Sequence, residues 1–250
     1  MSYQIQEINR RIQADPKEFV DACDAAYAEK IERAARAIAE NVRTCPIVLL
    51  SGPSGSGKTT TAMKIAEALR GMGISSQSLA MDDYFRTVNP RTAPRTPEGD
   101  IDFESPACLD MDLLGKHLNA LARGEEIHLP RYNFVTRVQS GPIGRPMRLG
   151  KDEVVVCEGI HALNDDIAAY CPDAFRLYIS ARSVVVDGDG QEIFKGTWMR
   201  LLRRLVRDSN FRGTPAAATL DMWANVRRGE KRFISPFKER ANLMFDSSFP

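Results

Sequence analysis

The sequence predicts an α/β protein built on a doubly wound parallel sheet, and three observations carry that prediction. Continuous apolar runs occur at 47–50, 154–157 and 177–179, as expected for strands that are buried on both faces. Helical patterns separate these runs, and strands that alternate with helices indicate a parallel sheet. A glycine-rich loop follows the first run and precedes a helix, so ligands are expected beyond the carboxyl ends of the strands.

The glycine-rich loop at 52–59 fits the phosphate-binding pattern GxxxxGK[ST]. Its glycines allow backbone N–H groups to turn toward a phosphate, and the helix N-terminus adds partial positive charge. Lys58 is expected to reach the outer phosphates, and the Thr59 hydroxyl to ligate Mg²⁺. A chance Gly-Ser-rich turn is the alternative, but the strand before the loop and the helix after it favour nucleotide binding. The predicted nucleotide-binding residues of the loop are Gly52, Ser54, Gly55, Ser56, Gly57, Lys58, Thr59 and Thr60.

Composition narrows the class of protein. The chain has 250 residues, 43% of them hydrophobic and 27% charged, enough for one large core with a modest appendage. A net charge of +1 argues against a general polyanion-binding surface, so nucleic acid is not an expected partner. Five cysteines without CxxC spacing disfavour a disulfide framework and a structural zinc site. No export segment or membrane-length apolar run is apparent, so we expect a cytoplasmic protein without membrane contact.

The N-terminal part, residues 1–44, is predicted to be a helical extension of a phosphate-loop domain at 45–250. Asp15 is a candidate N-cap, followed by Pro16 in the first turn and by Glu18 as the reciprocal capping acid. The helix then runs toward Val42, with apolar residues every three to four positions. This stripe packs either on the protein's own sheet or on a partner, so a homo-oligomer is an open alternative.

The remaining elements follow in order along the chain. The helix after the loop ends near Gly71, where glycine can adopt the left-handed conformation. A proline-rich stretch at 86–99 is expected to be a functional loop, and 187–190 a tight turn. The further predicted elements are strand 78–81, helix 106–123, short strands within 127–134 and 146–149 that form a small β-flap, helix 198–208, a helix from 214 to 229 and a weaker strand at 242–247.

Two acidic residues follow predicted strands. Asp82 lies where a carboxylate can accept a proton from a hydroxyl near the γ-phosphate, whereas Asp83 points to a different side. A solvated turn or helix cap is an equal alternative for Asp82 from position alone. Glu158 ends a buried strand, where an unpaired acid is costly without a cation, so we expect it to hold Mg²⁺.

Arginines recur along the helix predicted at 198–208. Arg200, Arg203, Arg204 and Arg207 fall along one helical face, and Arg212 follows in the next turn. Such a stripe suits an arginine-rich helical lid that clamps transferring phosphates. Spacing alone leaves a solvated charged face as the alternative.

Seven motifs occur in a fixed order along the chain: GPSGSGKTT, MDDYFR, DFESP, LPRYNFVT, VVVCEGIHAL, RLLRRLVRDSNFRG and WANVRRGEKRFISPF. Together they resemble the phosphoribulokinase/uridine kinase family, most closely its bacterial uridine-kinase-like nucleoside kinases. The resemblance covers roughly residues 26–250 and includes several motifs beyond the phosphate loop. It implies a P-loop kinase that uses ATP and Mg²⁺ to phosphorylate a hydroxyl of a small-molecule acceptor.

Carried over by position, the resemblance assigns acceptor-site residues. The family's catalytic acid falls on Asp82, and its flap aromatic that faces the acceptor falls on Tyr132. A tyrosine of uridine-cytidine kinases is here Phe85, their acceptor-binding aspartate is Glu104, and their base-contacting histidine is Arg137. These departures leave pyrimidine specificity open, because an arginine at 137 would suit an acidic or phosphorylated acceptor.

The resulting prediction is an ATP-dependent kinase of a nucleoside or a related hydroxylated metabolite. Asp82 is the expected base, and Lys58, Arg204 and Arg207 are the expected groups that neutralise the transferring phosphoryl, with Arg203 and Arg212 at the nucleotide. One alternative is a kinase for a sugar phosphate or a pantothenate-like acid. The other is a nucleotide-dependent regulatory protein that switches a partner through the N-terminal helix.

Overall fold

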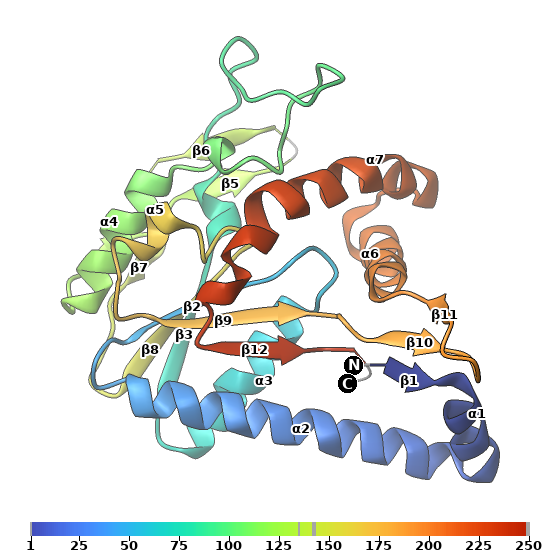
Figure 1. The fold of residues 1–250 in the computed structure, drawn as a ribbon. Coiled ribbons are helices and arrows are strands. Elements are labelled where there is room, and N and C mark those ends of the chain that lie inside the picture. Colours follow the sequence, from blue (N-terminus) through green and yellow to red (C-terminus); the bar gives the residue numbers. More distant parts are fainter. Residues whose placement is uncertain (1, 135, 142–143, 249–250) are drawn as a thin grey trace.

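The computed structural model describes residues 2–134, 136–141 and 144–248, and its centre is a fully parallel five-stranded sheet (Figure 1). The strand order is β12-β9-β2-β8-β3. The bounds are Ile47–Ser51 for β2, Ser75–Ala80 for β3, Glu153–Glu158 for β8, Phe175–Ser180 for β9 and Leu243–Asp246 for β12. The predicted doubly wound α/β architecture is therefore confirmed.

Each face of the sheet is covered by helices, because alternate residues of the central strand point to opposite sides. Ile47 and Leu49 of β2 belong to one apolar core, with side chains of α4 (Met111–Ala122) and α5 (Asp165–Ala168). Val48 and Leu50 belong to the other core, with side chains of α2 (Pro16–Asn41) and α3 (Lys58–Gly71). In Figure 1, α2 runs along the whole length of the sheet on this second side. A sheet apolar on both faces thus explains the unbroken hydrophobic strands.

Helix α2 begins at the predicted N-cap, but Glu18 is not the reciprocal capping acid, because its carboxylate accepts from Arg11 (3.1 and 3.2 Å) and the Asp15 N–H donates to Arg11 O. Asp15 Oδ1 accepts hydrogen bonds from Lys17 N (2.9 Å) and Glu18 N (3.0 Å). The apolar stripe lies in the core against α3 and the sheet, so this chain itself covers it; its buried members are Tyr27, Ile31, Ala34, Ala35 and Ile38. The division at residues 44 and 45 and the homo-oligomer stay predictions.

Replacing Ile38 by alanine should lower the free energy of unfolding by about 2–5 kcal/mol, since the lost atoms leave a cavity between α2 and the sheet. Ile38 is only 1% exposed, whereas Val20 on the same helix is 54% exposed. Val20→Ala is the matched control and should change stability by less than about 0.5 kcal/mol. Urea denaturation measures both, and equal effects would show that α2 does not share the sheet's core in solution.

Three smaller sheets occur beside the five-stranded sheet in the described residues. The predicted flap region forms two antiparallel pairs: β4 (Ile127–His128) with β7 (Pro146–Met147), and β5 (Arg131–Asn133) with β6 (Val138–Ser140). A third small sheet lies near the N-terminus and was not predicted. It pairs β10 (Val184–Val186) with β1 (Ser2–Gln4) in parallel and with β11 (Glu192–Phe194) in antiparallel orientation, and α1 (Ile5–Ala14) follows β1. The predicted turn at 187–190 joins β10 to β11.

Several predicted bounds need correction. The helix predicted over 106–123 is a 3₁₀ turn at Pro106–Cys108 followed by α4, because Asp110 caps α4 by accepting a hydrogen bond from Leu113 N (3.1 Å). The arginine helix is longer than predicted: α6 spans Gly196–Arg212 and ends at Gly213, whose φ is 61°. Further C-terminal elements are α7 (Ala216–Gly229), a π turn at Glu230–Ile234 and a 3₁₀ turn at Ser235–Arg240. Within the described ranges, none of the helices has the length and apolar composition needed to cross a bilayer.

Candidate active site

The phosphate loop connects the end of β2 to the first residue of α3, Lys58. Gly55 has φ 75°, and a Cβ at this position would lie 2.4 Å from the carbonyl oxygen of Arg200 in α6. Gly57 precedes α3 with φ 82°. Glycine at position 55 is therefore required both by the backbone angle and by the close approach of α6.

The Lys58 ammonium is held at the centre of the loop. Its Nζ donates to the carbonyl oxygens of Gly52 (2.8 Å) and Pro53 (3.3 Å). Burial lowers the pKa of Lys58 to about 8, and the negative charges of Glu158 and Asp82 oppose that decrease. The lysine therefore lies within electrostatic reach of both acids that the sequence singled out.

Thr59 and Glu158 form a polar pair at the start of α3. The Thr59 hydroxyl donates to Glu158 Oε1 at 2.7 Å, while Glu158 Oε2 is buried without a hydrogen-bond partner among the described residues. A buried carboxylate oxygen beside a hydroxyl fits a hard cation. Mg²⁺ is usually bound by one or two protein oxygens together with phosphates and water, so the Thr59 hydroxyl and the Glu158 carboxylate suit this ion.

Asp82 and Asp83 face different partners in the 3₁₀ turn η1 (Met81–Tyr84) that follows β3. Asp82 is exposed and its charge acts on Lys58. Asp83 is partly buried, which raises the pKa of its carboxyl, while a hydrogen bond from the backbone of Tyr132 opposes that rise. The two neighbouring acids therefore differ in surroundings: Asp83 contacts the flap, whereas Asp82 is exposed and close enough for its charge to act on Lys58.

Glu104 lies close enough to Lys58, Asp82 and Arg204 for their charges to act on its carboxyl. Burial raises the pKa of its carboxyl to about 7, against the opposing positive charge of Arg204. Its backbone segment is anchored to α7, because the Asp102 carboxylate pairs with Arg228 at 2.8 Å. A Cβ on Gly229 would lie 2.3 Å from the Glu104 Cβ, so the two segments touch.

Glu104→Gln should stabilise the protein above neutral pH. A carboxyl whose pKa is raised on folding binds more protons in the folded state, so its contribution to stability falls as pH rises from its unfolded value near 4.5 to about 7. The advantage of the variant should be absent at pH 4, grow across that window and level off above pH 7 at about 1–3 kcal/mol. Denaturation at pH 4.5 and pH 8 measures it. A constant difference at both values would contradict the raised pKa.

Three aromatic side chains form a cluster at the flap. Phe85, Tyr132 and Phe134 pack together with ring centroids 5.0–5.9 Å apart. The Tyr132 hydroxyl is buried and has no hydrogen-bond partner in the described ranges. Arg137 has φ 58°, and its guanidinium lies over the Phe103 ring at 5.4 Å. The predicted acceptor residues Phe85 and Tyr132 are thus in contact with each other, whereas Arg137 stacks outside that cluster.

The arginines of α6 bind two partners: the phosphate loop and the buried acid Asp208, which was not predicted as a site residue. Arg204 donates to Ser54 Oγ at 2.9 Å, which ties α6 to the phosphate loop. Asp208, 2% exposed, pairs with Arg204 (3.2 Å) and Arg207 (2.8 Å). Arg212 is 3.9 Å from the same carboxylate, and its side chain is 54% exposed. The i,i+4 spacing of Arg204 and Asp208 was the sequence signal for this pair.

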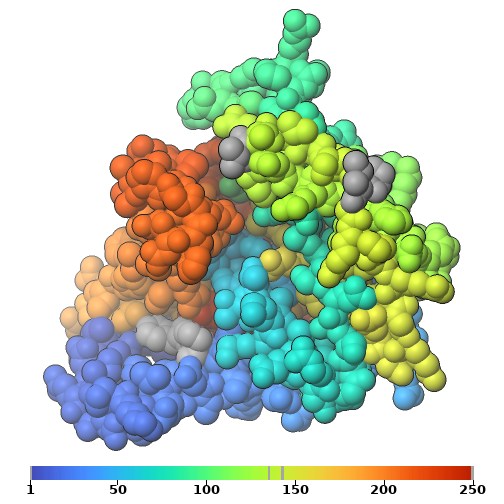
Figure 2. All heavy atoms as spheres, turned by 180° about the vertical axis from the view of Figure 1, so that it is seen from behind, coloured from blue at the N-terminus to red at the C-terminus, as the bar shows by residue number. Residues whose placement is uncertain are grey.

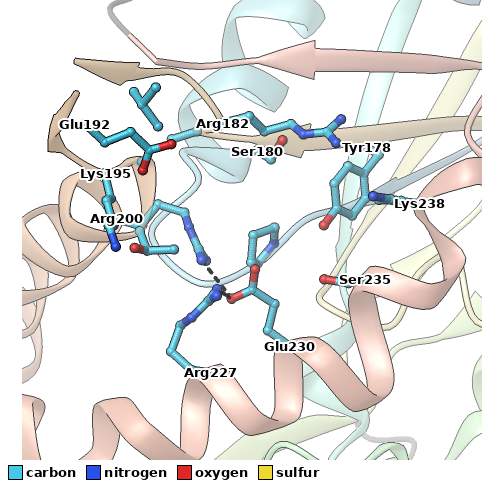
Figure 3. Close-up of a pocket in the computed structure, with 15 residues that line it drawn as sticks. Tyr178, Ser180, Arg182, Glu192, Lys195, Arg200, Arg227, Glu230, Ser235 and Lys238 are labelled. Carbon is cyan, nitrogen blue, oxygen red and sulfur yellow. Dashed lines mark hydrogen bonds and ion pairs between the residues drawn. The ribbon is translucent and has the colours of Figure 1, made fainter. Parts of the chain in front are cut away.

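Arg200, which the sequence placed in the phosphate-clamping stripe, is buried and binds protein groups behind the loop, and these contacts were not predicted. Arg200 donates to Ser54 O (3.1 Å) and to Glu230 (2.7 Å), and Arg227 binds the same carboxylate. Figure 3 shows these two arginines converging on Glu230. No sequence signal connects Arg200 with Glu230, because 30 residues separate them.

Ser247, just beyond β12, links the loop to α6. Its hydroxyl donates to Ser56 O at 2.6 Å, and its carbonyl oxygen accepts from Arg203 at 2.9 Å. Arg203 therefore reaches the end of the sheet, and it also lines the cavity that holds Lys58, Thr59 and Thr60. Of the predicted nucleotide-binding arginines, Arg203 borders this cavity and Arg212 does not.

Known proteins with similar sequences are kinases, and the matches cover most of this chain. A uridine kinase from Deinococcus deserti is 31% identical over 199 residues, which are 79% of this chain and 86% of that protein. A uridine kinase from Halobacterium salinarum is 28% identical over 196 residues, 78% of this chain and 77% of that protein. A D-glycerate 3-kinase structure from Cryptococcus neoformans var. grubii matches with a TM-score of 0.54 at 13% identity, covering 82% of this chain and 88% of that one, and shows the shared fold alone.

The family model described as phosphoribulokinase/uridine kinase matches residues 47–248. That range includes the phosphate loop, both strand-end acids and the arginine helix, and it leaves α1 and α2 outside. The chain therefore belongs to the phosphoribulokinase/uridine kinase family.

Proposed function

We propose that the protein is an ATP-dependent kinase that transfers the γ-phosphoryl group to a hydroxyl of a nucleoside, uridine- or cytidine-like, or of a related small metabolite. The observation that carries the proposal is the arrangement at one edge of the sheet, where the phosphate loop holds Lys58, Thr59 donates a hydrogen bond to Glu158 at 2.7 Å, and Asp82 follows β3. A cation for phosphate, an exposed carboxylate and a candidate metal ligand together suit phosphoryl transfer. Membership of a kinase family supports the same conclusion.

The loop and α6 supply positive charge for the phosphates. Backbone N–H groups of the loop, the N-terminus of α3 and Lys58 bind the β- and γ-phosphates. Arg204 and Arg207 are held by Asp208 beside the loop, so their guanidinium groups are oriented before ATP binds. Such preorganised charge stabilises the transferring phosphoryl without reorganisation during the reaction.

Asp82 acts as the base. The acceptor hydroxyl oxygen attacks the γ-phosphorus while Asp82 accepts the hydroxyl proton. The bond between the γ-phosphorus and the β–γ bridging oxygen breaks, and ADP leaves with that oxygen. The exposed position of Asp82 gives an acceptor direct access to its carboxylate.

The Thr59 hydroxyl and Glu158 are the groups that would hold Mg²⁺. When bound, the ion would neutralise charge on the phosphates. The unpartnered Glu158 oxygen supports this assignment more directly than the sequence motif does.

Phe85, Tyr132 and Glu104 are the proposed acceptor-binding residues for a nucleoside. The stacked rings offer an apolar wall, and the Tyr132 hydroxyl can hydrogen-bond an acceptor. An acidic or phosphorylated metabolite is the second candidate, because the Arg137 guanidinium of the flap can pair with a carboxylate or phosphate.

A panel of nucleosides, sugar phosphates and hydroxy acids tests both candidates by ADP release. We expect one class to raise ADP formation by about 10²-fold or more over the acceptor-free rate, as transfer to a well-positioned hydroxyl should. Hydrolysis that ignores every acceptor but responds to a protein partner would contradict the kinase proposal and favour a nucleotide-dependent switch.

A further inference from the structure

Helix α2 forms one wall of the cavity that contains the phosphate loop. The cavity is one space of about 730 Å³, a size typical of small-molecule sites. Asp24, Tyr27 and Ala28 of α2 line it together with Lys58 and Thr59 of the loop.

Contacts with the rest of the protein hold this wall in place. The Tyr27 hydroxyl is 2.8 Å from Thr61 Oγ1, in the first turn of α3, and its ring packs edge-on against Phe245 of β12 at 5.4 Å. Lys30 Nζ donates to the carbonyl oxygen of Asp246 at 3.1 Å. Figure 2 shows the N-terminal helices (blue) next to the α3 region (cyan). Helix α2 is thus fixed to the helix whose N-terminus carries the phosphate loop.

The charges around the cavity are unevenly distributed. Lys58, Arg203 and Arg207 line its loop and α6 sides, and Lys64 of α3 lies over the Tyr27 ring at 5.8 Å. Helix α2 itself contributes the acid Asp24 and the small apolar Ala28, and Asp24 repels phosphates. The surface that α2 offers therefore suits a group that donates hydrogen bonds, such as a ribose or a base with an exocyclic amine.

We propose that α2 completes the nucleotide site and contacts the nucleoside end of the bound triphosphate, at Ala28 and Asp24. The inference rests on the proposed function, because it assumes that the phosphates lie at Lys58 and Thr59. It goes beyond the family match, which begins at residue 47 and does not include α2. The N-terminal helix is then a nucleotide-binding element as well as a cover for the sheet.

Comparing ATP with inorganic tripolyphosphate tests this inference by calorimetry on the full chain. Ala28→Trp fills the α2 side of the cavity and should weaken ATP binding by about tenfold or more, while tripolyphosphate, which lacks a nucleoside, binds within about twofold of wild type. Asp24→Ala removes only an exposed carboxylate, so it should fold normally and weaken ATP by about tenfold.

Ala26→Trp is the matched control. Residue 26 is exposed and does not line the cavity, and a two-residue step turns it about 200° around the helix from Ala28. Wild-type ATP affinity in both Ala28→Trp and Asp24→Ala would overturn the inference, as would equal weakening of ATP and tripolyphosphate. If the wild-type protein binds neither ligand, the proposed function fails as well, so the two failures are distinguishable.

Discussion

Replacing Asp82 by asparagine is expected to lower kcat by about 10²- to 10⁴-fold, the usual contribution of a positioned general base. Asparagine is nearly isosteric but cannot accept the hydroxyl proton. The lost interaction acts mainly in the transition state, so ATP affinity should stay near wild type. ADP release with an acceptor identified by the panel measures kcat, and calorimetry measures ATP binding.

Asp83→Asn is the control for the neighbouring carboxylate. Asp83 accepts a hydrogen bond from the backbone of Tyr132, so its loss should affect the flap and the KM for the acceptor more than kcat. If Asp83→Asn is the crippling change and Asp82→Asn is nearly silent, the family motif is aligned one residue out of register. If neither change slows transfer, the protein uses another base.

Replacing Lys58 by alanine should reduce turnover by about 10³-fold or more and also weaken ATP binding, because it removes the lysine of the loop from the β- and γ-phosphates. Unlike Asp82→Asn, this change should therefore appear in both kcat and nucleotide affinity. ADP release and calorimetry on the same preparation separate the two effects.

Lys151→Ala removes an exposed lysine from the turn before β8 and should leave both quantities unchanged. Thermal denaturation checks the fold of Lys58→Ala, since Lys58 also binds the Gly52 and Pro53 carbonyls. Wild-type turnover in a folded Lys58→Ala protein would refute the assignment of the loop as a catalytic phosphate site.

The central sheet could be predicted because its inner strands are apolar on both faces. Strand β8 is buried along its centre, and an unbroken run of valines is a strong local signal. The edge strand β3 begins at Ser75, three residues before the predicted start. The prediction missed these three residues because they are polar and partly exposed, so they give no apolar signal. Strand β1 pairs with β10 about 180 residues away, so no local pattern reveals either.

In the candidate site, too, some features could be predicted from local sequence and others could not. The loop, Asp82 and Glu158 could be predicted because each lies at a fixed position relative to a strand end. Arg200 was predicted as a member of the arginine stripe, but its pairing with Glu230 could not be predicted, since it depends on a contact between α6 and the start of the π turn. The raised pKa of Glu104 likewise depends on burial by segments that are distant in sequence.

The pairing of Arg200 with Glu230 has a consequence for how related sequences can diverge. Both side chains are buried, and replacing Glu230 alone would leave the buried Arg200 charge uncompensated at a cost of about 3–5 kcal/mol. Replacing Arg200 alone would leave Glu230 paired with Arg227. An acid at position 230 should therefore be retained wherever position 200 is an arginine, although nothing in the local sequence around either residue marks that linkage.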